Sequence, residues 1–225
     1  MGYNRAMLVL ASNSPRRREL LSLLGIPFTV HAVEVDESPL RGEHPREYVS
    51  RLSRQKAEQA VAQLGGERLV LAADTTVALE EHAERWEILG KPQNVQEAAE
   101  MLRRLRGRTH FVFTGIALCH IPTSQLWTDV CVSEVPMRNY SDAEMQAYIA
   151  SGDPFDKAGG YAIQHRGFHP VENFTGCFAN VMGLPLCQLA RLLARAGIEV
   201  DDPLAPLCVR AFAYLCPLAE NLAEE

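Results

Sequence analysis

The sequence predicts an α/β fold, in which a mixed sheet flanked by helices forms two lobes around a central cleft. Short apolar runs alternate along the chain with segments whose apolar residues recur every three or four positions. The 225 residues, 47% of them hydrophobic, can bury the core of one large domain or of two joined lobes. Neither an internal repeat nor a low-complexity linker divides the chain. One continuous α/β unit is therefore expected.

The first strand and helix meet at an unusual junction. Residues 6–12 read AMLVLAS, a short apolar strand. A helix follows, with Ser14 as its N-cap, Pro15 at its first position and Gly25 near its end. Three arginines, 16–18, then open this helix, although a helix N-terminus carries the positive end of the dipole. We expect something negatively charged to bind there.

A second strand and helix follow. Residues 28–37, FTVHAVEVDE, alternate well enough for a strand that ends in Asp36 and Glu37. Residues 45–64 have apolar side chains at helical spacing. Lys56 is expected on the polar side of that helix, where a solvated lysine is the default.

The middle of the chain predicts a long strand, a hairpin and a third helix. Residues 67–80, ERLVLAADTTVALE, form a buried strand that is interrupted by a single acid, Asp74. The polar residues 80–87 then suggest a hairpin. Asn94 caps the next helix and Gly107 ends it.

The last elements are two strands and two helices. The strands, 109–119 and 126–138, are expected to pair antiparallel. A capping box at Ser141 starts a helix that stops near Gly152, and residues 184–197 form the last clear amphipathic helix.

Composition excludes several classes of protein. The formal net charge of −6 argues against a general nucleic-acid binder. No run approaches the roughly 18 apolar residues of a membrane helix, and the N-terminal residues lack the apolar core of a signal peptide. The six cysteines form no CxxC pair, so we expect reduced, mostly packed thiols in a cytoplasmic protein.

One basic loop, the single acid Asp74 and the acidic pair Asp36 and Glu37 are candidates for chemistry. The loop of residues 12–18, SNSPRRR, combines a helix N-terminus with arginines and so suits a phosphate, although a solvated basic helix start would look the same. Asp74 inside an apolar strand favours a general base or a Mg²⁺ ligand over an exposed acid. Asp36 and Glu37 suit a hard cation, but alone they suit a solvated turn better.

Further polar residues follow the acids. Lys91, before a proline, is expected to be extended and able to enter a cleft. The stretch 156–164, DKAGGYAIQ, places glycines beside Tyr161 and Gln164, which could stack on and hydrogen-bond a base, or simply form a turn. No GxxxxGK[ST] motif is present, which excludes a P-loop NTPase. Arginines, acids, lysines and an amide together fit phosphoryl chemistry on a nucleotide.

Eight ordered motifs carry a resemblance to a known family. They are LASNSPRRRELL, VDE, RLSRQKA, AADTTV, LGKP, LRGRTHFVFTGIAL, DKAGGYAIQ and NVMGLPL, from about Leu8 to about Gly197. Together they resemble the signatures of the Maf family of nucleoside triphosphate pyrophosphatases. The resemblance implies a Maf/ITPase-like fold and hydrolysis between the α- and β-phosphates with a divalent metal, Mg²⁺ or Mn²⁺. It also implies a house-cleaning role and a link to septum formation. We also expect the protein to form a homodimer.

The resemblance assigns roles to individual residues. Asp74 matches the family's proton acceptor, and from the residues alone it could equally be a metal ligand together with Glu37. The phosphate-binding and other polar positions are Ser12, Arg16, Arg17, Glu37, Lys56 and Lys91. The positions tied to choosing dTTP and UTP are Arg16, Thr75 and Gln164.

Three segments depart from the family pattern. Residues 80–87 lengthen a hairpin, and the segment around His165, His169 and Glu172 is diverged, with a spacing that suits a surface loop better than a metal site. We expect the family domain to cover residues 1–199, with 200–225 as a tail containing a short docked helix. Alternative functions are the same chemistry on a modified nucleotide, such as 7-methyl-GTP or ITP, and a nucleotide-binding regulator of cell division with little turnover.

Overall fold

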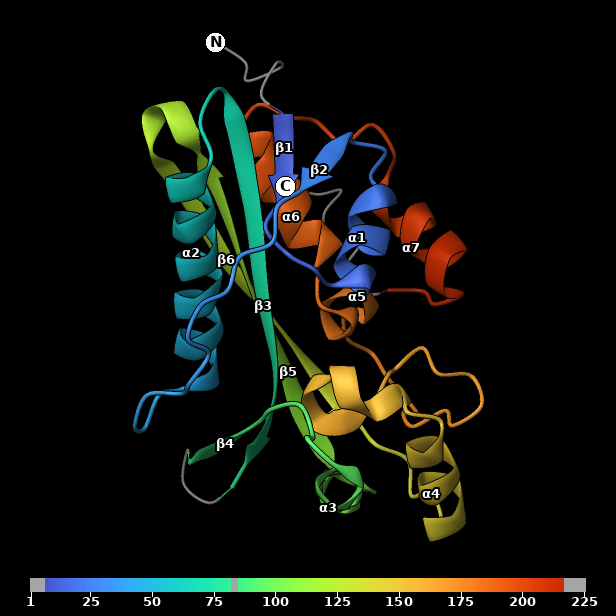
Figure 1. The fold of residues 1–225 in the computed structure, drawn as a ribbon. Coiled ribbons are helices and arrows are strands. Elements are labelled where there is room, and N and C mark those ends of the chain that lie inside the picture. Colours follow the sequence, from blue (N-terminus) through green and yellow to red (C-terminus); the bar gives the residue numbers. More distant parts are fainter. Residues whose placement is uncertain (1–6, 82–84, 217–225) are drawn as a thin grey trace.

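The computed structural model describes residues 7–81 and 85–216 and shows a mixed sheet with helices on both faces (Figure 1). Its strands are β1 (Met7–Leu10), β2 (Phe28–Val30), β3 (Arg68–Glu80), β4 (Trp86–Leu89), β5 (Thr109–His120) and β6 (Gln125–Pro136). Its helices are α1 (Pro15–Ser22), α2 (Pro45–Gln63), α3 (Val95–Leu105), α4 (Asp142–Ala150), α5 (Phe178–Met182), α6 (Leu186–Arg195) and α7 (Leu204–Phe212), with 3₁₀ turns η1 (Ile121–Thr123), η2 (Asp153–Asp156) and η3 (Ala158–Gly160).

The sheet has the strand order β2-β1-β3-β5-β6, with β4 beside part of β3. Strand β1 runs parallel to β2 and β3, whereas β5 runs antiparallel to both β3 and β6. The predicted mixed sheet and the antiparallel pairing of 109–119 with 126–138 are therefore confirmed.

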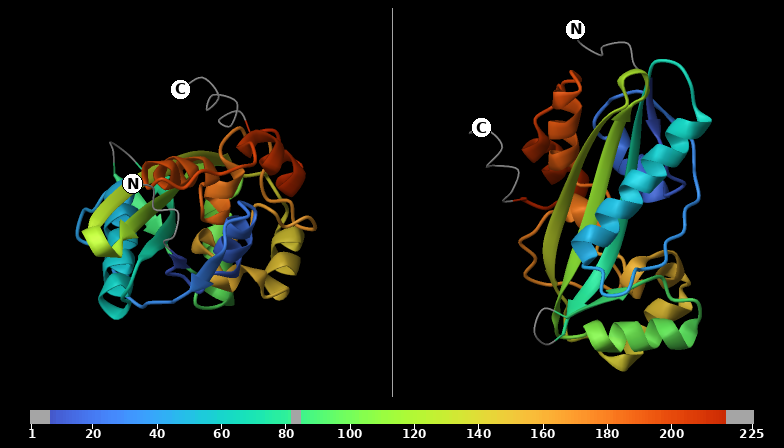
Figure 2. Two further views of the ribbon diagram at one scale, coloured as in Figure 1. Left: turned by 90° about the horizontal axis from the view of Figure 1, so that it is seen from above. Right: turned by 90° about the vertical axis from the view of Figure 1, so that its left-hand side faces the viewer.

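The helices divide between the two faces (Figures 1 and 2). Helix α2 packs through Ala57 and Ala60 against alternate residues of β1, β3 and β5. The other face carries two separate cores. One packs α1, α5, α6 and α7 on β1, β3 and β5, and the other packs α3 and α4 around the far ends of β3 and β5. These two cores on one sheet are the two predicted lobes; we call the core with α1, α5, α6 and α7 the upper core and the core with α3 and α4 the lower core, as they lie in Figure 1.

The predicted second strand is too long. Strand β2 covers only Phe28–Val30, and residues 31–37 are not in the sheet. Strand β2 is an edge strand whose partner, β1, ends at Leu10, where the last hydrogen bond runs from the His31 amide to the Leu10 carbonyl. Beyond that point the chain turns into α1, so residues 32–37 have no strand to pair with, despite their alternating pattern.

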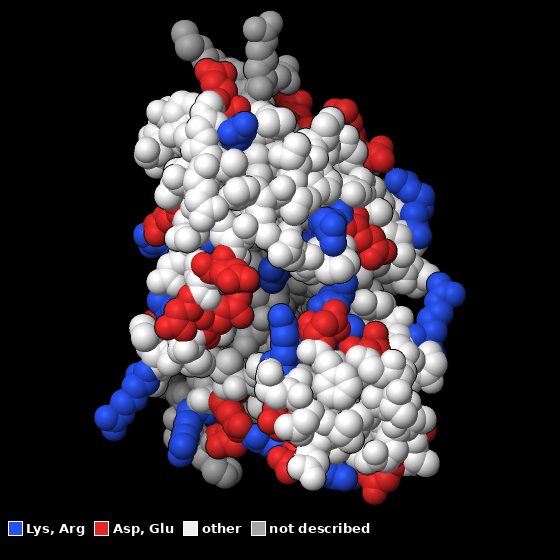
Figure 3. Space-filling model, viewed as in Figure 1, with Lys and Arg blue, Asp and Glu red and all other residues white. Residues whose placement is uncertain are grey.

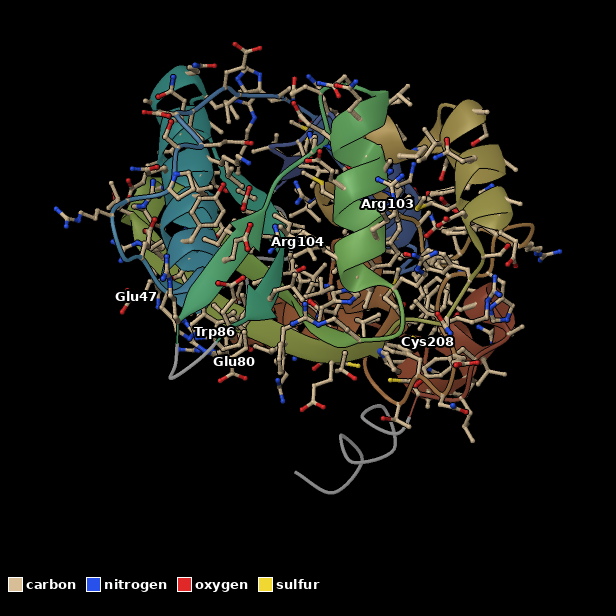
Figure 4. The ribbon with its side chains drawn as sticks, turned by 90° about the horizontal axis from the view of Figure 1, so that it is seen from below. Glu47, Glu80, Trp86, Arg103, Arg104 and Cys208 are labelled. Atoms are coloured by element: carbon tan, nitrogen blue, oxygen red, sulfur yellow. The ribbon has the colours of Figure 1, made fainter. Side chains whose placement is uncertain are left out.

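The predicted hairpin at 80–87 is confirmed where the structure describes it. Val77–Glu80 pair antiparallel with Trp86–Leu89, and residues 82–84 lie outside the described part. Helix α3 holds this hairpin, because the Arg104 guanidinium pairs with the carboxylate of Glu87 and lies 3.5 Å from that of Glu81. Figure 4 labels Arg104 on α3 and Trp86 and Glu80 in the hairpin.

The chain after residue 200 adds helix α7 to the upper core. Leu207 and Cys208 of α7 are buried in the same cluster as α6. In the described part of the chain, no helix has both the length and the apolar character needed to cross a membrane.

A single glycine sets how closely α2 approaches the sheet. A Cβ at Gly115 of β5 would overlap the Val49 carbonyl group of α2, lying 2.7 Å from its carbon and 3.1 Å from the Ser50 amide nitrogen. We predict that Gly115→Ala lowers the free energy of unfolding by about 1–3 kcal/mol, because backbone atoms must move. Urea denaturation checks this, with Gly65→Ala as control, since nothing lies within 4 Å of a Cβ there. Equal midpoints for the two variants would contradict the prediction.

Candidate functional site

A cleft of about 470 Å³ opens between the two lobes. On the face shown in Figure 3 it is a hollow bordered by both basic and acidic side chains. Every site residue predicted from the sequence lines it: Ser12, Arg16, Arg17, Glu37, Lys56, Asp74, Thr75, Lys91 and Gln164. The structure therefore brings the predicted set together in one cleft.

The cleft exists because one edge of β3 changes partner. Residues 68–71 pair with β1 and residues 77–80 pair with β4, and no described strand pairs with that edge of residues 72–76. Asp74 lies in this gap, in the middle of a long strand and not at its end. Because side chains alternate along a strand, Asp74 faces the α2 side and Thr75 faces the side of α1 and α5.

A buried ammonium joins the two acids of the cleft. Lys56 Nζ lies 2.6 Å from Asp74 Oδ1 and 2.6 Å from Glu37 Oε1. Lys56 is only 8% exposed and Asp74 only 6%. A carboxylate at this depth is tolerable because it has an oppositely charged, hydrogen-bonded partner.

The expectation of a solvated Lys56 is wrong. Lys56 follows Leu52 and precedes Ala60 at intervals of four residues, and both neighbours are fully buried. Residues four apart share one face of a helix, so Lys56 lies on the apolar side of α2. That spacing was visible in the sequence, but a lysine on an apolar stripe is normally taken for an edge residue with a solvated tip.

The two acids differ in their environments. Burial raises the pKa of Asp74, opposed by the charges of Lys56 and Arg17. Burial acts in the same sense on Glu37, but there the hydrogen bond and charge of Lys56, with help from Lys91, outweigh it and hold the pKa below its ordinary value. Asp74 is therefore the acid that more readily keeps or takes a proton.

The adjacent Asp36 does not belong to this cluster. It is exposed, and its Oδ1 accepts a hydrogen bond from the Ser38 amide at 2.9 Å. Of the two acids that end the motif VDE, only Glu37 lines the cleft.

The arginines at the start of α1 have three different environments. Arg17 is held by the Gly183 carbonyl at 3.0 Å, Thr75 Oγ1 at 3.1 Å and Ser12 Oγ at 3.3 Å. Arg16 crosses the cleft to the other lobe, where its Nη1 lies 2.8 Å from Asp156 Oδ2. Arg18 is exposed and does not line the cleft. Only two of the three arginines can therefore meet a ligand there.

Sequence reasoning missed Asp156, although it stands in the motif DKAGGYAIQ. It pairs with Arg16 and also with Lys157. Lys157 is buried, and its ammonium is engaged by Asp153 and Asp156, so it organises this wall of the cleft. An Asp next to a Lys is a common surface pair, and only the tertiary contact with Arg16 distinguishes it.

The remaining candidates lie on the same wall of the cleft as Asp156 and Lys157, which we call the lower wall. Lys91 and Gln164 are exposed to the cleft. Tyr161 is buried, with its hydroxyl 2.8 Å from Nε2 of His110, a ring whose pKa burial lowers to about 3. His165 of the diverged segment accepts a hydrogen bond from the Phe168 amide.

The two carboxylates of the cleft fit a divalent cation that is shared with phosphate. Asp74 Oδ1 and Glu37 Oε1 each lie 2.6 Å from the same nitrogen, so they are at most 5.2 Å apart. No group of three or more acidic, histidine or cysteine side chains in the described residues could hold a metal by itself. One or two carboxylates completed by phosphate oxygens and water are what Mg²⁺ usually takes.

A family model and relatives from other organisms match most of the chain. A family model described as Maf-like protein matches residues 7–196. A relative from Thermomicrobium roseum, named dTTP/UTP pyrophosphatase, is 47% identical over 94% of this chain and 94% of its own. Another of that name, from Myxococcus xanthus, is 48% identical over 89% of this chain and 97% of its own. Among solved structures, the Staphylococcus aureus Ham1 protein is 15% identical, with a TM-score of 0.42 over 59% of this chain and 72% of that one. That similarity is too low to support an argument.

Removing the buried ammonium should make stability strongly dependent on pH. We predict that Lys56→Met costs about 3–5 kcal/mol at pH 8, because Asp74 is left as a buried charge without its nearest partner. Its raised pKa makes the folded state bind a proton more tightly than the unfolded state. Stability of the variant therefore falls as pH rises from the ordinary Asp value to the raised one, and the loss shrinks in acid.

Urea denaturation between pH 4 and pH 8 measures this. Lys91→Met, which removes an exposed lysine of the same cleft, is the control and should change stability little. In the double variant Lys56→Met/Asp74→Asn the pH dependence should largely disappear. A loss that is the same at every pH in the single variant would show that the effect is packing and not charge.

Proposed function

This chain belongs to the Maf-like protein family, and we propose that it hydrolyses dTTP and UTP between the α- and β-phosphates. The products are the nucleoside monophosphate and pyrophosphate. One observation carries the proposal most: a single cleft joins a carboxylate–ammonium–carboxylate cluster to two arginines of a helix N-terminus. The names of the relatives from Thermomicrobium roseum and Myxococcus xanthus supply the substrate class.

The upper wall of the cleft binds the triphosphate in this proposal. Arg17 has five N–H donors and uses three, one each on Nε, Nη1 and Nη2, to hold its protein partners. One N–H therefore remains on each terminal nitrogen, and a pair of this kind suits two phosphate oxygens. Arg16, together with Lys91 from the opposite wall, adds positive charge where negative charge accumulates on the leaving pyrophosphate.

The two acids take different roles. Asp74 has a raised pKa and a buried position, so it accepts the proton of the attacking water. Glu37 is more exposed and its pKa is held low, so it stays ionised and can hold the divalent cation. Lys56 keeps both carboxylates in place. When bound, Mg²⁺ or Mn²⁺ would neutralise part of the charge on the phosphate oxygens.

The lower wall of the cleft recognises the uracil or thymine base in this proposal. Gln164 is exposed to the cleft and carries both a donor and an acceptor, which a uracil or thymine edge requires. Tyr161 lies in the same wall. Arg16 and Thr75 complete the set that the family resemblance ties to the choice of dTTP and UTP.

A pyrophosphate-release screen tests the function, with canonical and modified nucleoside triphosphates and with Mg²⁺ or Mn²⁺. We predict selective turnover of dTTP and UTP. Turnover of 7-methyl-GTP or ITP instead would keep the reaction and reject the substrate. Well-folded protein that turns over nothing would favour the regulator of cell division.

Asp74→Asn should lower kcat by about a hundredfold or more while the protein stays folded, because the amide cannot accept the proton. The screen measures this loss, and circular dichroism checks the fold. Turnover near the wild-type rate would contradict the role of Asp74. A titration of the variant with Mn²⁺ separates its two assignments, since rescue by excess metal would make Asp74 a ligand and not the proton acceptor.

Gln164→Glu should lower kcat/KM for UTP by about tenfold, and by less for a purine triphosphate, because a carboxylate lacks the amide donor. Gln96→Glu adds the same charge on the exposed side of α3, away from the cleft, and is the matched control. Equal losses for UTP and the purine would contradict the base-reading role of Gln164.

Three expectations from the sequence stay predictions. They are a homodimer, a cytoplasmic location and a link to septum formation. Light scattering after size-exclusion chromatography would measure the first directly.

A further inference from the structure

A buried hydroxyl behind the cleft is connected to the arginine that the proposed function places on the phosphates. Thr114 of β5 is fully buried and does not line the cleft. It is the cross-strand neighbour of Thr75, and the two Oγ1 atoms lie 2.9 Å apart. The Thr114 hydroxyl also lies 3.1 Å from the main-chain carbonyl of Asn180 in α5.

The chemistry of these groups fixes the direction of each hydrogen bond. A carbonyl oxygen only accepts, so Thr114 donates its single hydrogen to Asn180. Thr114 can then only accept from Thr75, whose hydrogen goes to Thr114 at 2.9 Å in preference to the Gly183 carbonyl at 3.5 Å. Thr75 is left with lone pairs alone, and one of them accepts from Arg17 Nη2 at 3.1 Å. If Thr114 instead donated to Thr75, Thr114 Oγ1 and the Asn180 carbonyl oxygen would lie 3.1 Å apart with no hydrogen between them.

The end of this chain of bonds is rigid. The Asn180 side chain is fully buried, and its amide donates to the Val112 carbonyl at 3.1 Å and to Ser133 Oγ at 2.9 Å. These bonds tie α5 to β5 and β6. The Asn180 carbonyl also accepts from the Gly183 amide, and the Gly183 carbonyl accepts from Arg17 Nε. Two of the three anchors of Arg17 thus lead back to the same turn at the end of α5.

We propose that Thr114 is a positioning residue that makes the Thr75 hydroxyl an obligatory acceptor and so fixes the Arg17 guanidinium for the triphosphate. Without the Thr114 hydroxyl, Thr75 keeps only the long 3.5 Å contact to the Gly183 carbonyl as an acceptor for its hydrogen, so its hydroxyl rotates and no longer holds a lone pair fixed toward Arg17. Arg17 then has to be ordered by the ligand itself, which weakens binding. The inference rests on the proposed function only in that the ligand carries a triphosphate.

Binding of inorganic triphosphate, measured by calorimetry on the full chain, tests this without a base or turnover. We predict that Thr114→Val raises the Kd about tenfold, whereas Thr114→Ser, which keeps the hydroxyl, stays within about twofold of wild type. Thr76→Val is the matched control, because Thr76 is a buried threonine of β3 whose hydroxyl, among the described residues, hydrogen-bonds only the Val77 carbonyl, at 3.5 Å. It should leave the Kd unchanged.

A double-mutant cycle separates this role from simple loss of packing. Thr75→Val should weaken triphosphate binding as Thr114→Val does, and the double variant should be no weaker than Thr75→Val alone. The kcat/KM values for UTP and for a purine triphosphate should fall by the same factor in Thr114→Val, because the effect acts on the phosphates.

Several results would overturn the proposal. They are wild-type affinity in Thr114→Val, additive losses in the double variant, equal losses in the valine and serine variants, or no binding of triphosphate by the wild type. If Thr114→Val does not fold, Thr75→Val against Thr75→Ser carries the same test, and equal affinities there reject it. Wild-type protein that binds triphosphate but turns over no nucleotide would contradict the proposed function alone.

Discussion

The buried ion cluster around Lys56 is the constraint on which the rest of the site depends. An isolated carboxylate inside a strand would be neutralised or would destabilise the fold, yet Asp74 lies there beside Lys56 and within the field of Arg17. The cluster joins α2, β3 and the loop before α2. With one ammonium between two carboxylates, Glu37 is kept ionised by a lowered pKa whereas the pKa of Asp74 is raised. Acid–base chemistry needs two groups whose pKa values differ in this way.

The change of partner along β3 explains why the site lies where it does. The upper core ends and the lower core begins on either side of Thr75, on the same face of one strand. One strand thus belongs to both lobes and carries site residues on both of its faces. The lobes are linked across the opening by Arg16 and Asp156, so a ligand that takes Arg16 also competes with a contact between the lobes.

The arginines at the start of α1 also make sense in this setting. A cation at a helix N-terminus is unfavourable by itself, but each of the two that line the cleft has acceptors from distant parts of the chain. Arg17 uses carbonyl and hydroxyl oxygens, and Arg16 uses a carboxylate. The anchors leave part of the Arg17 guanidinium available for an anion, which is the feature that the sequence alone suggested.

The α/β class, most of the element order and the inventory of charged groups could be predicted from the sequence, because periodicity, caps and motifs are local properties. The prediction had the wrong length for β2 and the wrong environment for Lys56, because strand length depends on the partner strand and burial depends on which face of α2 meets the sheet. The hydrogen bonds of Arg17 to Gly183 and Thr75 depend on the tertiary structure. So do the surroundings of Asp74 and Thr75 on the two faces of β3. Those contacts join residues far apart in the chain, and their energies depend on packing that no short segment contains.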